Sequence, residues 1–243
     1  MADSVHLRPS RKDECLAYPA PAGPPQRERM MRGTVEELRG LLQEKSIRRG
    51  AFTLASGDKS NYYCDTKATT LSPLGCYLVG EALLPLVRVF KGEAVGGLAI
   101  GALFISTPIV YASQLSGTPV YGFAVRQAQK EHGLLGSVEE SFHPSGTPLL
   151  GPGRRVVVVD DVVTKGGSVI KAIGAVNERG CDITAVISLV DRKAGGRERI
   201  ERSGLSYFSL YYTDSTGELH VDPDTARLVG DPATKARAAA IGR

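Results

Sequence analysis

The sequence predicts an α/β domain with a mostly parallel central sheet flanked by helices. Residues 156–159 are four consecutive valines, the composition of a strand that is buried on both faces in a parallel sheet. Residues 94–125 have the pattern of strand, helix and strand, and such a βαβ unit joins parallel strands. With 243 residues, 42% of them hydrophobic, the chain is long enough to bury the core of one such domain.

The N-terminal part is expected to consist of two regions. Residues 1–29 are polar and contain a cluster of prolines, so we expect a disordered extension that cannot bury enough surface to fold. Residues 30–71 are expected to form a helix and a small hood of two strands, at 52–54 and 62–65. Thr34 and Glu37 have the spacing of a capping box at the helix start, and one helical face carries Val35, Leu38, Leu41 and Leu42.

Residues 72–221 are expected to form the core of the domain, followed by a polar C-terminal tail at 222–243. Ser72-Pro73 has the pattern of a helix start, and Pro85 is expected to end or kink that helix. Its buried face is expected to carry Leu74, Leu78, Ala82 and Leu83. The later elements are expected as strand 94–101, helix 105–115, strand 119–125, strand 156–159, helix 168–179, strand 183–190, helix 197–202 and strand 206–212. Residues 127–145 lack periodicity, which is typical of a lid over a site or of a disordered segment.

The composition excludes several classes of protein. The net charge is +4 and the pI is about 8.9, but the basic residues are scattered rather than gathered in the stripe that nucleic acid requires. The longest apolar runs are too short to cross a membrane. Four cysteines lie far apart in the sequence, without the spacing of a zinc site or a disulfide framework, so we expect reduced thiols in the cytoplasm.

The chemistry is concentrated after the valine run. Asp160 and Asp161 are expected at the carboxyl end of the strand, and residues 164–168 form a loop of small residues before a helix. Such a loop offers backbone N–H groups to a phosphate, and the helix dipole adds to the attraction. The two carboxylates suit ribose hydroxyls or a divalent cation, so the stretch predicts a site for a sugar phosphate. A strand that ends in two acids also fits a Walker B element, but the partner loop G-x-x-x-x-G-K-[ST] is absent from the sequence.

Three stretches carry a resemblance to a known family. Residues 156–168 resemble the phosphoribosyl pyrophosphate motif of type I phosphoribosyltransferases. Residues 52–57, followed by Ser60-Asn61-Tyr62-Tyr63, resemble the hood of orotate phosphoribosyltransferases, and residues 125–133 resemble their mobile catalytic loop. The similarity runs from about residue 34 to about residue 213. It implies a type I phosphoribosyltransferase-like fold and the transfer of a phosphoribosyl group from phosphoribosyl pyrophosphate to orotate, which yields orotidine 5′-phosphate and pyrophosphate in UMP biosynthesis.

The resemblance also implies roles for individual residues. The catalytic residues would be Arg126, Lys130, His132, Asp160 and Asp161. Orotate would be bound by Tyr62, Tyr63, Thr164 and Arg192. Phosphoribosyl pyrophosphate would be bound by Arg126, Gln127, Lys130, His132, Asp160, Asp161, Val162, Val163, Thr164, Lys165, Gly166, Gly167 and Ser168. The family implies Mg²⁺, which we expect to be held mainly by substrate and water near the two aspartates. It also implies a homodimer whose lid loop is shared across the interface.

The sequence departs from the family pattern at three places. Gln127 and Ala55 stand where the family often has lysine, and Gly101-Ala102-Leu103-Phe104 replaces a polar turn. Two alternatives therefore stay open: a phosphoribosyltransferase for another base, such as a purine, and a regulatory nucleotide-binding protein with little catalytic activity. Two assignments are open as well, because Tyr62 and Tyr63 also fit a core position and Arg192 also fits a surface charge.

Overall fold

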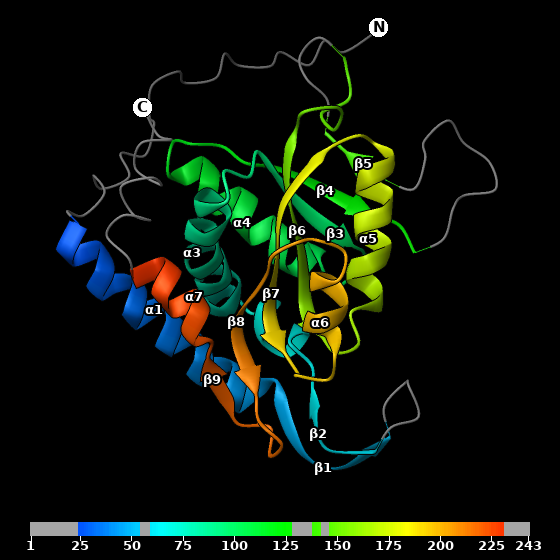
Figure 1. Ribbon diagram of the computed structural model, residues 1–243. Helices are drawn as coiled ribbons and strands as arrows, with labels where there is room; N and C mark the ends of the chain where they lie inside the picture. Colours follow the sequence, from blue (N-terminus) through cyan, green and yellow to red (C-terminus); the bar gives the residue numbers. More distant parts are fainter. Residues whose placement is uncertain (1–23, 54–58, 128–137, 142–145, 231–243) are drawn as a thin grey trace, which may run out of the picture.

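The computed structural model describes residues 24–53, 59–127, 138–141 and 146–230. Within them, one sheet has seven strands in the order β5-β4-β3-β6-β7-β8-β9 (Figure 1). Its inner strands are parallel: β4 (Tyr121–Val125), β3 (Ala94–Leu98), β6 (Arg155–Val163), β7 (Asp182–Asp191) and β8 (Tyr207–Thr213). The edge strands β5 (Val138–Glu140) and β9 (Leu219–Val221) pair antiparallel to their neighbours. The predicted α/β class with a mostly parallel sheet is confirmed.

Helices cover both faces of this sheet (Figure 1). One face carries α3 (Pro73–Val89) and α4 (Leu103–Leu115), with α1 (Pro24–Lys45) packed on α3; the other carries α5 (Gly167–Glu178) and α6 (Gly196–Glu201). Strand β6 lies between them, so Val157 and Val159 join the core on the α3 side, and Val156 and Val158 join the core on the α5 side. Burial on two sides is the physical reason for four consecutive valines.

The first helix begins earlier than the sequence led us to expect. Helix α1 starts at Pro24, so residues 24–29 are helical, while residues 1–23 lie outside the described part. The predicted capping box is wrong, because Thr34 lies inside the helix. Proline is compatible with a first helical turn, and residues 26–32 are mostly good helix formers. The predicted buried face is confirmed: Leu38 and Leu42 are fully buried, with Val35 and Leu41 packed beside them.

The hood is a two-stranded antiparallel ribbon outside the main sheet. Strands β1 (Ile47–Thr53) and β2 (Lys59–Cys64) pair with an irregularity between Arg49 and Phe52. The connecting turn, with Ala55, lies outside the described residues. The ribbon is held to the core by Tyr62, whose hydroxyl lies 2.7 Å from Thr213 Oγ1 on β8.

Other local differences have simple causes. The Ser72 cap is confirmed, since its side chain accepts a hydrogen bond from the Gly75 N–H at 3.1 Å. Pro85 does not end the helix, which continues to Val89 with Leu84 and Leu86 buried around it. Leu74, expected on the buried face, is 46% exposed, because Gly75 is the residue of this first turn that faces inward; Leu78, Ala82 and Leu83 are buried as expected.

The segment expected to be one irregular loop contains β5, and α7 (Pro223–Gly230) lies within the expected tail. The short α2 (Lys67–Thr70) links the hood to α3. None of the helices in the described ranges has the length and apolar character that crossing a membrane would require.

We expect Leu38→Ala to lower the free energy of unfolding by about 2–5 kcal/mol, because it leaves a cavity where α1 packs against the core. The neighbouring variant Glu37→Ala serves as the control, since Glu37 is exposed and its replacement should change stability by less than about 0.5 kcal/mol. Urea unfolding measures both values. Equal small effects would contradict the packing of α1 described here.

Candidate active site

The direction in which successive strands are added to the sheet reverses between β3 and β6. From β3 it continues through α4 to β4 on one side, and from β6 it continues through α5 to β7 on the other (Figure 1). Open α/β sheets bind their ligands at such a switch point, beyond the carboxyl ends of the strands. The β3–β6 pairing ends at Gly96 and Val158, while β6 remains paired with β7 as far as Val163 and Asp191. Strand β6 therefore runs through both aspartates instead of ending before them.

The two aspartates have different surroundings. Asp160 is 7% exposed, and its Oδ1 accepts a hydrogen bond from the Asp161 N–H at 3.1 Å. Asp161 accepts two hydrogen bonds, from Thr66 Oγ1 at 2.7 Å and from the Val162 N–H at 2.9 Å. Within the described part of the chain neither carboxylate forms an ion pair. Burial, and then the charge of Asp161, raises the pKa of Asp160 to about 8.

A glycine allows the turn after β3 to approach the aspartates. A Cβ atom at Gly101 would overlap Asp161 Oδ1 and lie 3.3 Å from Asp160 Oδ1, so a side chain there would displace the carboxylates. The unexpected apolar residues of this turn also have a structural place. Leu103 and Phe104 form the first turn of α4 and are partly buried, and Ile105 is fully buried behind them.

The predicted phosphate loop lies at the N-terminus of α5. Gly166 has φ 71° and is the residue before the helix, a backbone conformation that favours glycine. A Cβ atom at Gly196 would lie 2.6 Å from the Thr164 carbonyl oxygen, so α6 begins in direct contact with the loop. The first amides of α5 have no carbonyl partner one turn earlier within the helix. The arrangement is that of an anion site at a helix N-terminus.

Arg192 lies between the phosphate loop and the hood. Its backbone N–H donates to the Val163 carbonyl at 2.9 Å. Its side chain donates from Nε to Tyr62 Oη at 3.2 Å and from Nη2 to Ser60 Oγ at 3.0 Å, and its guanidinium carbon lies 4.6 Å from the centre of the Tyr62 ring. Arg192 is therefore not an isolated surface charge. It follows the carboxyl end of the inner strand β7, and its guanidinium N–H groups donate hydrogen bonds to the hood.

The two tyrosines of the hood lie in different environments. Tyr62 is 5% exposed and its hydroxyl contacts Thr213 and Arg192, which fits the core interpretation. Tyr63 is 41% exposed, and its ring lies 5.7 Å from the ring of Phe52. Adjacent residues of a strand point to opposite faces, so only Tyr63 offers an open ring to a planar base.

The structure describes only the beginning of the predicted catalytic loop. Arg126 follows β4 directly and forms an ion pair with Glu139 of β5. Gln127 is exposed. Lys130 and His132 lie outside the described residues.

Three residues contact the candidate site without having been predicted as part of it, namely Ser60, Thr66 and Gly101. Ser60 stands within the hood stretch that carried the resemblance, so that stretch could have identified it. Thr66 is fully buried and contacts an aspartate 95 positions away. Only the tertiary fold brings these two residues together, so no local pattern could have indicated the contact.

Comparisons with known proteins agree with this geometry. Residues 110–213 match the phosphoribosyl transferase domain family. The chain is 40% identical over 179 residues to an orotate phosphoribosyltransferase of Aquifex aeolicus, an alignment that covers 72% of this chain and 93% of the relative. The chain belongs to the orotate phosphoribosyltransferase family. It is accordingly a pentosyltransferase of pyrimidine biosynthesis, as the sequence motifs predict.

Solved structures of this family are similar to the chain. The orotate phosphoribosyltransferase of Mycobacterium tuberculosis H37Rv in complex with Fe(III) dicitrate has a TM-score of 0.62 and 35% identity, covering 72% of this chain and 94% of that one. The same enzyme in complex with phosphoribosyl pyrophosphate has a TM-score of 0.59 and 33% identity, with 72% and 94% covered. These neighbours confirm the type I phosphoribosyltransferase fold.

We expect Asp160→Asn to stabilise the protein without ligands, and to do so more strongly at high pH. Because the pKa of Asp160 rises from 3.8 to about 8 on folding, the folded state binds a proton more tightly, and stability is lost as the pH rises between these values. Asparagine cannot ionise, so the variant does not lose this stability as the pH rises. The gain in unfolding free energy of the variant over the original protein should be larger at pH 8.5 than at pH 4.5 by more than about 1 kcal/mol.

Denaturant titrations at the two pH values measure this difference. The control is Asp182→Asn at an exposed position, which should show no such trend. A gain that is equal at both pH values, or a loss at pH 8.5, would contradict the burial of a charged Asp160.

Proposed function

We propose that this enzyme binds both substrates of the orotate phosphoribosyltransferase reaction at the carboxyl edge of the sheet. In this proposal Asp160 and Asp161 hold the ribose hydroxyls, residues 164–168 hold the 5′-phosphate, and Arg192 receives the carboxylate of orotate. The observation that supports it is the meeting of three kinds of group at one edge: two carboxylates, a helix N-terminus and a guanidinium. In this division of the chain, residues 30–71 serve as N-terminal helix and hood together with the helical residues 24–29, residues 72–221 serve as the transferase core, and residues 222–243 serve as a tail that contains α7.

The reaction displaces pyrophosphate from C1 of the ribose by a ring nitrogen of orotate. Two aspartates that accept hydrogen bonds from the ribose, and a loop that holds its phosphate, fix C1 in position, so the reaction gains from orientation. Arg192 turns the base so that its nitrogen faces C1. Negative charge grows on the leaving pyrophosphate, and the cations assigned to meet it are Arg126, Lys130 and His132. A lid over the site would also exclude water, which otherwise hydrolyses the activated sugar.

The two aspartates fit the Mg²⁺ that we propose as cofactor. Their oxygens are the hard ligands that Mg²⁺ prefers, and in the described residues neither carboxylate has an ion-pair partner to neutralise it. No third histidine, cysteine or acid joins them in that part of the chain, so most ligands would come from substrate and water. When bound, Mg²⁺ supplies positive charge to the pyrophosphate.

We also propose a homodimer in which the lid loop reaches the site of the partner. Large apolar side chains are exposed on α3 and α4 and on the turn before α3, namely Leu71, Leu74, Tyr77 and Tyr111. Helices α3 and α4 pack against one another, and we take these side chains as the proposed interface. Exposed apolar surface of this kind is typical of a protein interface.

The direct test is turnover with phosphoribosyl pyrophosphate, Mg²⁺ and one of four bases: orotate, adenine, hypoxanthine or uracil. We expect orotidine 5′-phosphate and pyrophosphate from orotate, at a rate far above that of the other bases. Turnover with a purine and none with orotate would support the first alternative. Binding of nucleotide without release of pyrophosphate would support a regulatory protein.

We expect Lys130→Ala to reduce kcat about a hundredfold, while the affinity for phosphoribosyl pyrophosphate changes little. A cation that meets charge on the leaving group acts mainly in the transition state, and such a contact contributes on the order of 3 kcal/mol. Gln129→Ala is the matched control in the same loop and should leave kcat within about threefold. Steady-state kinetics and calorimetric titration separate the two quantities. A large loss of affinity with unchanged kcat would show that Lys130 does not act mainly in the transition state.

If the lid acts across the dimer, two inactive variants should restore activity to each other. Mixing Lys130→Ala with the double variant Asp160→Asn, Asp161→Asn gives heterodimers with one intact site each. Random reassortment of equal amounts should restore up to about a quarter of the original specific activity. Mass spectrometry confirms subunit exchange. Exchange without recovery would place each lid over the site of its own subunit.

A further inference from the structure

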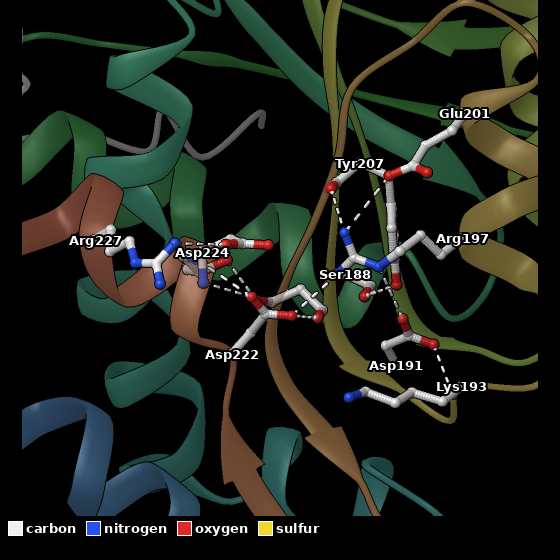
Figure 2. Close-up of polar contacts among 11 residues, drawn as sticks. Ser188, Asp191, Lys193, Arg197, Glu201, Tyr207, Asp222, Asp224 and Arg227 are labelled. Carbon is white, nitrogen blue, oxygen red and sulfur yellow. Dashed lines mark hydrogen bonds and ion pairs between the residues drawn. The ribbon is translucent and has the colours of Figure 1, made fainter.

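A buried ionic cluster joins α6 to the ends of β7 and β9 (Figure 2). At its centre is the guanidinium of Arg197. Its Nη2 lies 3.0 Å from Asp222 Oδ2, and its Nε lies 3.6 Å from Asp191 Oδ2. The two carboxylate side chains are only 2% and 6% exposed, Asp191 being the more buried. The mechanism described above uses none of these three residues.

Arg197 is held in one orientation by its other contacts. Its Nη1 donates to the Tyr207 carbonyl at 3.1 Å, and its guanidinium carbon lies 4.8 Å from the centre of the Tyr207 ring. That ring is fixed in turn, because the Tyr207 hydroxyl lies 2.7 Å from Ser188 Oγ and both residues are buried (Figure 2). The guanidinium therefore presents Nε to Asp191 from a fixed position.

Asp191 connects the fixed guanidinium of Arg197 to the turn that contains Arg192. Its Oδ1 accepts a hydrogen bond from the Lys193 N–H at 2.8 Å, which closes a turn of the chain around Arg192. Lys193 has φ 49°, a conformation that is unfavourable for a residue other than glycine and that this hydrogen bond helps to maintain. On the other side, the Arg192 N–H is bound to the Val163 carbonyl. Both flanks of Arg192 are thus fixed.

We propose that Asp191 and Arg197 are positioning residues that hold Arg192 in the orientation in which it receives the carboxylate of the base. The proposal rests on the role that the proposed function gives to Arg192. It makes the cluster a determinant of base recognition, distinct from the groups that bind phosphoribosyl pyrophosphate.

Stability alone is a poor explanation for Asp191 and Arg197. Burial raises the pKa of Asp191, so keeping its charge has an energetic cost, and a buried ion pair often stabilises a fold no more than apolar residues of similar size. Asp222 differs, because it has a structural task of its own. It accepts hydrogen bonds from the N–H groups of Asp224 and Thr225 at the start of α7, at 3.0 and 3.3 Å, and from Ser209 Oγ at 3.0 Å. A variant of Asp222 therefore serves as a control for the variants of Asp191.

The main test is Asp191→Asn in the full-length enzyme, with KM and kcat measured separately for each substrate. Asparagine keeps an oxygen for the Lys193 N–H but loses the ionic contact with Arg197. We expect KM for orotate to rise about tenfold while KM for phosphoribosyl pyrophosphate stays within about twofold. In an Arg192→Gln background the same change should have little further effect on KM for orotate, because the residue that it positions is gone.

Two further variants separate positioning from folding. Asp222→Asn removes the charge of the other buried carboxylate beside Arg197, and it should lower the melting temperature without a selective rise in KM for orotate. Arg197→Gln should raise KM for orotate selectively, as Asp191→Asn does. Arg197→Lys keeps the charge and should raise KM for orotate less than Arg197→Gln does. If Asp191→Asn fails to fold, the two Arg197 variants provide the same measurement.

Two results would overturn the proposal. One is an equal change in both KM values in Asp191→Asn and the Arg197 variants. The other is an undiminished effect of Asp191→Asn in the Arg192→Gln background. A failure of the proposed function looks different, because Arg192→Gln itself would then leave KM for orotate unchanged, or the original enzyme would not convert orotate at all.

Discussion

Two adjacent carboxylates in strand β6, that of Asp160 buried and that of Asp161 partly exposed, are the constraint around which the surrounding structure is arranged. Burial of Asp160 is unfavourable for its charge, yet the strand keeps it at the edge where β3 and β6 separate. Gly101 leaves room for the carboxylates, and Thr66 donates a hydrogen bond to one of them. The valines before them provide the buried strand that fixes their position. A site that binds a cation or ribose hydroxyls gains from a carboxylate such as that of Asp160, because its burial has already removed most of its contact with water.

The hood and the core meet through side chains rather than through a shared sheet. The β1–β2 ribbon is separate from the seven strands of the main sheet, and Tyr62, Ser60 and Thr66 connect it to β8, Arg192 and Asp161. Each of these contacts ends at a residue near the site. The position of the hood and the geometry of the site therefore depend on the same few hydrogen bonds.

The sequence predicted what short-range patterns determine. The valine run, the loop after it and the Ser72 cap were recognisable because the interactions that define them lie within a few residues. The start of α1 was predicted wrongly, since a capping pattern at Thr34 does not reveal whether helix-forming residues before it continue the helix. Alternation along β2 separates Tyr62 from Tyr63, but it does not say which of them faces inward. The contacts of Thr66 and Arg197 join distant segments, so only the fold identifies them.

The phosphate loop and the start of α6 approach each other at two glycines, and beside them Arg199 Nη1 donates to the Lys165 carbonyl at 3.2 Å. A Cβ atom at Gly166 would lie 3.2 Å from the Gly196 carbonyl oxygen, and one at Gly196 would crowd the Thr164 carbonyl. Glycine at both positions lets the two backbones come close without a side chain between them. In the proposed function, this close contact would let the loop that holds the sugar phosphate keep its form while the residues that contact the base vary over evolution.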